Sequence, residues 1–161
     1  DISPIVLRGV QDRNIIQKSF IVNQIKSKYG ENLSKYQFGV WGLSYKPGTN
    51  DMREAPSIHI ISQLIKLGAR VIAHDPAAID EAYSLFPDEW INSSLIFKKN
   101  EYDVLIHSDA LILLTEWKLY RNPDFNRIKN HLKAPVIFDG RNQYSPKKLM
   151  KLGFIYKGIG R

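Results

Sequence analysis

Cysteine is absent from this 161-residue sequence. That absence excludes a disulfide framework, a thiolate metal site and a covalent thiol mechanism within these residues. The histidines, at positions 59, 74, 107 and 131, show no metal-ligand spacing and have no cysteine partners. We therefore expect no metal site.

Long hydrophobic runs are absent as well. The longest uninterrupted apolar stretch is Ala110 to Leu114, far below the roughly 20 residues that span a bilayer, so we expect no membrane partner. No charged and then apolar leader opens the chain, which makes the cytoplasm the expected compartment, although the start at Asp1 suggests trimming.

The familiar phosphate-binding motifs are missing. The stretch "GLSYKPGT" lacks the Gly-Lys-Ser/Thr end of a P-loop, and no G-x-G-x-x-G follows a predicted strand. A standard dinucleotide site is therefore not predicted within this chain.

The composition itself is that of a globular protein, with 43% hydrophobic and 24% charged residues. A net charge of +7 attracts phosphates in general, whether on a nucleotide, a nucleic acid or a lipid. Charge alone does not choose among these ligands.

Residues 5–29 have apolar residues at three- and four-residue spacing, which predicts a long amphipathic helix that ends at Gly30. This helix is too long for the domain that follows to cover its whole apolar face, so we expect the helix to pack against a partner. From Phe38 onward short apolar runs alternate with helical stretches. Strands are predicted at 38–43, 69–75, 95–97, 110–115, 135–140 and 154–156, and helical segments at 55–67, 77–86, 101–107, 123–132 and 145–152.

This alternation predicts an α/β fold: a Rossmann-like, doubly wound parallel sheet of five or six strands, preceded by a long α-helix. The commonest strand order for such a sheet is 3-2-1-4-5-6. In that order the loops 44–54, 115–123 and 139–144 meet beyond the carboxyl ends of the strands, where these folds bind ligands.

The first and third of these loops offer three candidate cations: Lys46, Arg53 and Arg141. Together with the helix N-terminus near Ala55, they predict a site for a diphosphate or another multiply charged anion. A structural alternative exists for each cation. Arg53 could pair with Asp51 or Glu54, Arg141 could be held by Asp139, and Lys46 could be an exposed loop residue.

Other polar residues near the expected crevice have competing interpretations. Asp75 ends the second predicted strand, where it could bind a ribose, but the Pro76 that follows it favours a turn. Glu116 and Trp117 could face the crevice, although Trp117 could equally pack across its rim.

Five ordered segments carry a family resemblance: "VWGLSYKPGTNDMREAPS", "GARVIAHDP", "DALILLTEW", "PVIFDGRNQY" and "GFIYKGIGR". They resemble the C-terminal, UDP-binding domain of UDP-glucose 6-dehydrogenases. The resemblance covers nearly all of residues 38–161, and residues 5–29 are similar to the end of the family's long central helix.

The resemblance implies an activity for the whole protein. The family oxidises the C6 alcohol of UDP-glucose to a carboxylate with NAD+, through a cysteine in an N-terminal NAD domain that precedes the part represented here. This chain would bind the UDP-sugar, would be inactive alone and would hold no catalytic residue. Residues 1–35 would end the connecting helix, residues 36–161 would form the UDP-sugar-binding domain, and residues 5–29 would form a homodimer contact.

Site residues follow from the same resemblance. It implies that Tyr45, Lys46 and Arg141 contact the substrate, and that Arg53 reaches toward NAD bound by the other half. Asn50 departs from the acidic residue that the family usually has at this position.

Two alternatives stay open at this point. Related dehydrogenases act on UDP-N-acetylmannosamine or GDP-mannose, although "DMREAPS", "TEW" and "DGRN" favour UDP-glucose. A basic α/β module that binds nucleic acid would also use the positive charge, but no predicted helix concentrates basic residues. We therefore expect no nucleic-acid partner.

Overall fold

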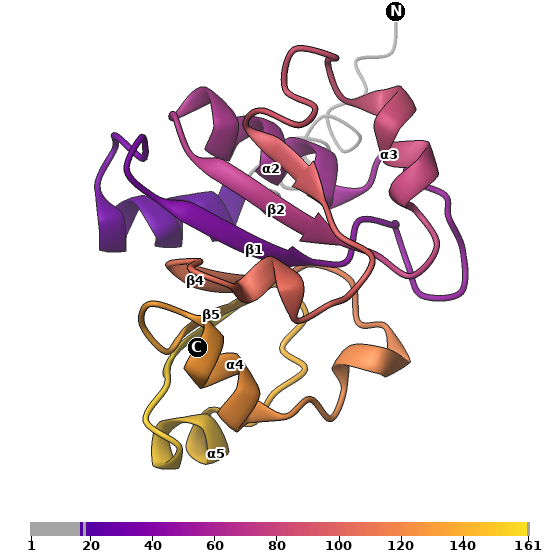
Figure 1. Cartoon of the computed structure of the whole chain (residues 1–161). Helices are drawn as coiled ribbons and strands as arrows, with labels where there is room; N and C mark the ends of the chain where they lie inside the picture. The colour runs from indigo at the N-terminus through magenta and orange to yellow at the C-terminus, as the bar shows by residue number, and fades with distance from the viewer. Residues whose placement is uncertain (1–16, 18, 161) are drawn as a thin grey trace, which may run out of the picture.

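A computed structural model describes residues 17 and 19–160, which form a six-stranded parallel sheet between two layers of helices (Figure 1). The strand order is β3-β2-β1-β4-β5-β6, which confirms the predicted fold class and topology. The strands are β1 (Gln37–Trp41), β2 (Arg70–His74), β3 (Leu95–Phe97), β4 (Ala110–Leu113), β5 (Val136–Asp139) and β6 (Ile155–Gly158).

Each helical stretch predicted after residue 50 is present, with bounds that differ by one or two residues. The α-helices are α2 (Pro56–Lys66), α3 (Ile79–Leu85), α4 (Phe125–His131) and α5 (Pro146–Lys151), and short 3-10 turns are η1 (Asp103–Leu105) and η2 (Lys118–Tyr120). Helix α2 begins at Pro56, whose missing N–H costs nothing in a first turn. It is followed by Gly68 at φ +94°, a left-handed conformation that suits glycine.

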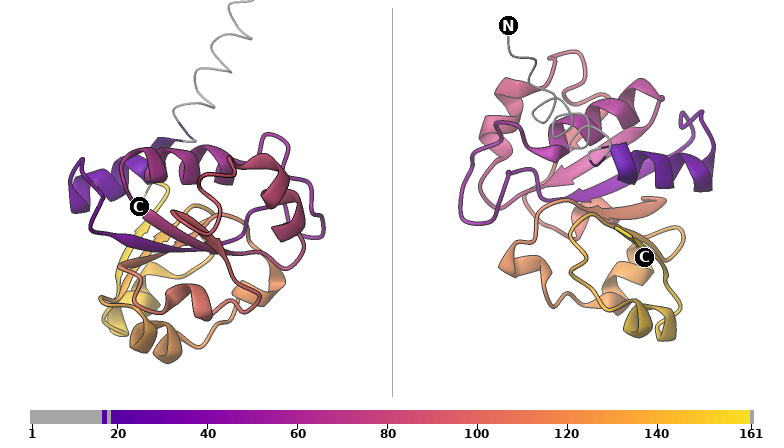
Figure 2. Two further views of the ribbon diagram at one scale, coloured as in Figure 1. Left: turned by 45° about the horizontal axis from the view of Figure 1, so that its top comes forward. Right: turned by 180° about the vertical axis from the view of Figure 1, so that it is seen from behind.

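The predicted N-terminal helix is described over residues 17 and 19–29, and it ends at Gly30 as expected. The rest of the predicted range, residues 5–16 and 18, lies outside the described residues. Ile21, Val22 and Ile25 are buried, so this helix packs into the core of the domain beside α2 (Figure 2).

Side chains of the strands alternate between the two helical layers, as the period of a β-strand requires. On β4, Ile112 joins the core under α2, whereas Leu111 and Leu113 join the core over α4 and α5. Figure 2 shows these two layers on opposite faces of the sheet. Burial on both faces explains why the strands are almost entirely apolar.

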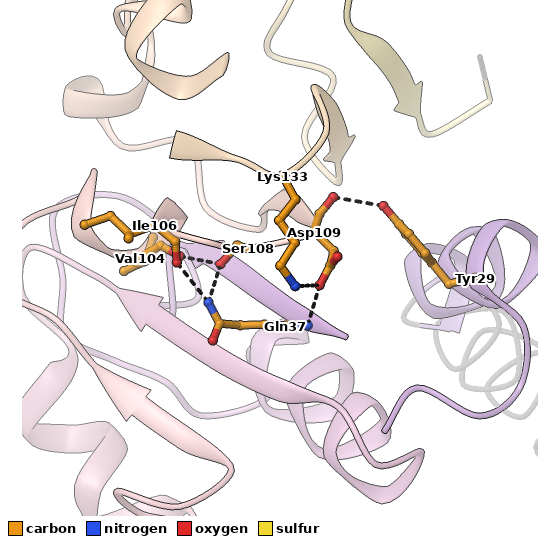
Figure 3. Close-up of polar contacts among 7 residues, drawn as sticks. All are labelled: Tyr29, Gln37, Val104, Ile106, Ser108, Asp109 and Lys133. Atoms are coloured by element: carbon orange, nitrogen blue, oxygen red, sulfur yellow. Dashed lines mark hydrogen bonds and ion pairs between the residues drawn. The ribbon is translucent and has the colours of Figure 1, made fainter. Parts of the chain in front are cut away.

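We call the end of the sheet where the parallel strands begin the amino edge, with residues 29–37 and 106–109 at its centre. Here the Asp109 carboxylate accepts hydrogen bonds from the Gln37 backbone N–H at 2.8 Å and from Lys133 Nζ at 3.1 Å (Figure 3). Tyr29 Oη donates to the Asp109 carbonyl at 2.9 Å, which ties the N-terminal helix to this edge. The Gln37 side chain donates to the Ser108 hydroxyl at 3.1 Å.

Within the described part of the chain, none of the helices is both long and apolar enough to span a lipid bilayer.

Candidate functional site

A cavity of about 490 Å³ opens at the opposite end of the sheet, which we call the carboxyl edge (residues 42–54, 75–78, 114–117 and 140–145). The loops after β1 and β5 line it, together with the residue that follows β4, so these segments meet as the strand order predicts. Its walls include apolar side chains of Ile21, Ile60 and Leu114 and polar groups of Tyr45, Glu54 and Arg141.

The loop after β1 turns sharply at Gly42. This residue has φ +91°, and a Cβ there would lie 2.5 Å from the Thr115 backbone nitrogen, so only glycine allows the first and fourth strand ends to approach so closely. The Thr115 hydroxyl donates to the Ser44 carbonyl at 2.6 Å, and the Tyr45 N–H donates to the Asp51 carbonyl at 2.8 Å. The loop is therefore closed on itself and fixed to β4.

Asp75 is the polar centre of the carboxyl edge, with only 2% of its surface exposed. Its Oδ1 accepts from two N–H groups of the turn that follows it, which confirms the predicted turn role. Its Oδ2 accepts from donors of the loops after β1 and β4. The donors are Ala77 N and Ala78 N to Oδ1, and Leu43 N, Ser44 N, Ser44 Oγ and Trp117 Nε1 to Oδ2. With both oxygens occupied by protein donors, the structure gives no support to the ribose alternative.

Asp139 has the equivalent position at the end of β5 and is fully buried. It accepts hydrogen bonds from the Arg141 N–H at 2.9 Å, the Tyr144 N–H at 3.0 Å and Tyr156 Oη at 2.9 Å. The alternative that Asp139 holds Arg141 is thus correct for the backbone but not for the guanidinium group.

The Arg141 guanidinium joins the loops after β1, β4 and β5. Its Nη2 donates to the Tyr45 carbonyl at 3.2 Å, and its Nε forms an ion pair with the Glu116 carboxylate. Because Lys46 follows Tyr45 directly, the structure places Lys46 and Arg141 at the same end of the molecule.

Asn142 joins the loop after β5 to the segment that follows β6. Its backbone is left-handed, at φ +54°, and its side-chain amide exchanges two hydrogen bonds of 2.9 Å with the backbone of Ile159. The chain after β6 is therefore fastened next to Arg141.

Arg53 does not line the cavity. It makes a two-pronged contact with Asp51, at 3.0 Å from Nε to Oδ1 and 2.8 Å from Nη2 to Oδ2, which agrees with the structural alternative for this residue. The hydrogen bonds from Arg53, with a smaller contribution from the charge of Lys46, lower the pKa of Asp51 to about 2. The Arg53 side chain is 86% exposed, so it can still turn toward a ligand outside this chain.

The structure thus brings Tyr45 and Arg141 together at the cavity, places Lys46 beside them and leaves Arg53 at the periphery. Among the described residues, no group of three or more His, Asp or Glu side chains is arranged to hold a metal ion. The positive groups suit an anion, and the apolar wall suits an uncharged ring or sugar face.

Sequence reasoning anticipated only the contact of Asp139 with Arg141, and it missed the contacts of Asp139 with Tyr144 and Tyr156 and the role of Asn142. Asp139 ends a buried strand, as Asp75 does, and an acidic residue in that position was the available signal. Asn142 carried a weaker signal, because Asn tolerates the left-handed conformation that it adopts. The contact with Ile159 has no local sequence signal.

Comparison with known proteins extends this description. Residues 39–146 match the UDP-glucose/GDP-mannose dehydrogenase family, UDP binding domain. A UDP-glucose 6-dehydrogenase from Pseudomonas aeruginosa is 39% identical over 156 residues, which cover 97% of this chain and 34% of that protein. The UDP-glucose 6-dehydrogenase TuaD from Bacillus subtilis is 35% identical, over 97% of this chain and 32% of its own length. The chain spans about a third of the length of these curated relatives.

Solved structures of nucleotide-sugar dehydrogenases share this fold. A UDP-glucose dehydrogenase from Pyrobaculum islandicum superposes with a TM-score of 0.74 at 26% identity, over 94% of this chain and 31% of that one. An NDP-N-acetyl-D-galactosaminuronic acid dehydrogenase from Methanosarcina mazei shares the fold, with a TM-score of 0.77 at 24% identity, over 100% of this chain and 32% of that one.

Proposed function

This chain belongs to the UDP-glucose/GDP-mannose dehydrogenase family, and on that premise we propose that it is the substrate-nucleotide-binding part of an NAD-dependent UDP-glucose 6-dehydrogenase. The whole protein would oxidise UDP-glucose to UDP-glucuronate. The NAD domain and the catalytic cysteine would come from the N-terminal portion that the relatives have, so this chain alone is expected to be inactive. Dehydrogenation of UDP-N-acetylmannosamine or GDP-mannose is the alternative.

One observation carries the proposal: Arg141 reaches from the loop after β5 to the Tyr45 carbonyl in the loop after β1, and both residues line the cavity. Two loops with cationic side chains are thereby joined at the reversal of the strand order, where doubly wound sheets bind ligands. In the proposed complex, Lys46 and Arg141 bind the diphosphate, and Tyr45, which is 52% exposed, packs against the nucleotide sugar.

Arg53 has a separate role in this proposal. Its exposure and its position at the periphery of the cavity support a contact with NAD held by the other half of the enzyme. In such a contact, the guanidinium group of Arg53 would bind a phosphate of NAD in place of the Asp51 carboxylate.

Residues 1–35 would connect the two halves, and residues 36–161 would form the UDP-sugar-binding domain. Residues 5–29 would also contribute to a homodimer, for which sedimentation of this chain offers a direct test. A monomer at every concentration would contradict the dimer but not the binding proposal. We expect the protein to work in the cytoplasm.

Binding is tested by calorimetric titration of the 161-residue chain with UDP, uridine and glucose. UDP should bind, and uridine and glucose should bind far more weakly. Lys46→Ala or Arg141→Ala should weaken UDP binding about tenfold to a hundredfold, because each removes a charge-assisted hydrogen bond. Lys147→Ala is the matched control, since it removes the same charge from an exposed position on α5. Equal affinities for all variants would contradict the proposed site.

The activity is tested by a chimera in which this chain replaces the corresponding third of the Pseudomonas aeruginosa relative. The folded chimera should reduce NAD+ when UDP-glucose is added. Oxidation of GDP-mannose or UDP-N-acetylmannosamine instead would favour the alternative substrates. A folded chimera that oxidises no nucleotide sugar would refute the proposed function.

A further inference from the structure

Glu116 is the carboxylate that pairs with Arg141, whereas Glu54 is the carboxylate that lines the cavity itself. Glu116 lies just after β4, and its Oε2 forms an ion pair with Nε of Arg141. The Glu116 and Arg141 side chains are 36% and 31% exposed, although the contacting Oε2 atom is itself buried and makes no hydrogen bond to the described residues. A partly exposed ion pair is separated at modest cost, which makes this contact exchangeable.

The contact uses a particular part of the guanidinium group. Nε and Nη2 form one edge of the planar fork, the edge with which arginine grips carboxylate or phosphate through two parallel hydrogen bonds. In Arg141, Nε is paired with Glu116, and Nη2 donates to the Tyr45 carbonyl at 3.2 Å. A phosphate that uses this edge must therefore displace Glu116.

The charges at the site lead to the same conclusion. Glu116 neutralises Arg141, and Asp51 neutralises Arg53 through a two-pronged contact. The site is thus less positive than Lys46, Arg53 and Arg141 together imply. A diphosphate carries more negative charge than one carboxylate, so it is the kind of anion that can take Arg141 from Glu116.

We propose that Glu116 is a specificity-determining competitor, which occupies the phosphate-binding edge of Arg141 in the empty site and is displaced by the diphosphate of the nucleotide. This inference rests on the proposed function, because it assumes that Arg141 binds the diphosphate. Glu116 thereby lowers the affinity of the site for all anions and leaves singly charged anions without net gain from Arg141.

The direction in which a substitution of Glu116 changes UDP affinity distinguishes a competitor from a residue that only orients Arg141. Glu116→Gln keeps the shape and removes the charge, so a competitor predicts UDP binding about twofold to fivefold tighter, the range expected when a partly exposed ion pair is removed. If Glu116 instead only oriented Arg141, the same substitution would weaken UDP binding.

The experiment is calorimetric titration of the 161-residue chain and its variants with UDP, after thermal unfolding has verified that each variant is folded. Glu89→Gln is the matched control. It makes the same change of charge at an exposed position in the segment before β3, and it should leave the affinity unchanged. In an Arg141→Ala background, Glu116→Gln should lose most of its effect.

The two proposals fail in different ways. Unchanged or weaker UDP binding by Glu116→Gln, together with a loss of binding by Arg141→Ala, would overturn the competitor role and leave the proposed function standing. If Arg141→Ala binds UDP as well as the unmodified chain does, or if no variant binds UDP, both proposals are wrong.

Discussion

Both ends of the parallel sheet are organised by aspartates, but the aspartates at the two ends have different kinds of partner. At the amino edge, Asp109 accepts one backbone N–H and the ammonium group of Lys133 (Figure 3). At the carboxyl edge, Asp75 accepts six hydrogen bonds, none of them from a cation. Asp139 similarly accepts two backbone N–H groups and a tyrosine hydroxyl.

The difference shows how a binding edge can be both rigid and cationic. At the amino edge the cation Lys133 is paired with Asp109 and helps to hold the structure together. At the carboxyl edge the buried carboxylates fix the loops through backbone and neutral donors, so Arg141 stays at the surface of the cavity and Lys46 lies beside it. The carboxyl edge should therefore tolerate loss of its cations, whereas it should not tolerate loss of its buried aspartates.

The largest effect is expected for Asp75→Asn. An amide would place N–H groups against donors that are buried in three loops, so the free energy of unfolding should fall by about 3 to 5 kcal/mol. Urea unfolding measures this loss. Asp88→Asn, at an exposed position, makes the same charge change and should alter stability by no more than about 0.5 kcal/mol. A similar small change for Asp75→Asn would contradict its central role.

Asp139→Asn should have an intermediate effect, about 2 kcal/mol, because this carboxylate has three donors instead of six. One of the donors is the Arg141 N–H, so the substitution should also weaken UDP binding. Urea unfolding and calorimetry measure the two effects separately. A stability loss without any change in UDP binding would mean that the backbone bond to Asp139 does not position Arg141.

Asp109→Asn tests the amino edge. Its side chain is 14% exposed and its cationic partner, Lys133, is 49% exposed, so the expected loss of stability is only about 1 kcal/mol. UDP binding should be unchanged, because this residue lies at the other end of the strands. An effect on UDP affinity as large as that of Asp139→Asn would remove the distinction between the two edges.

The smallest effect concerns Asp51 and Arg53 at the periphery of the cavity. Arg53→Gln should return the pKa of Asp51 from about 2 toward its ordinary value of 3.8, as NMR titration of the carboxyl carbon can show. Because the pKa is lowered in the folded state, the stabilisation is present above about pH 4 and is lost as the pH falls toward 2. An unchanged pKa would show that Arg53 does not hold Asp51.

The fold was predictable because its signals are local and repeated. Apolar runs of strand length alternate with helical stretches, and Pro56 and Gly68 mark the two ends of α2. Boundaries shifted because burial continues past the ends of the strands: Leu114 and Thr115 are buried but follow the end of β4.

The site was predictable only in part. The loops and their cations follow from the strand order, and the turn at Asp75 follows from the proline after it. The four donors to Asp75 Oδ2 come from residues 31 to 42 positions away, and no local pattern records such contacts. The pairing of Glu116 with Arg141 likewise depends on how two loops meet in space.

The placement of Trp117 gives the chain a built-in optical reporter. Its indole N–H donates to both Ser44 and Asp75, so it lies against the loop that carries Lys46. Trp41, in contrast, is sealed in the interior and stacked on Tyr120 with ring centroids 4.8 Å apart. Emission that changes when nucleotide is added can therefore be assigned to Trp117 without any attached dye, whereas Trp41 and the partly buried Trp90 before β3 supply a constant background.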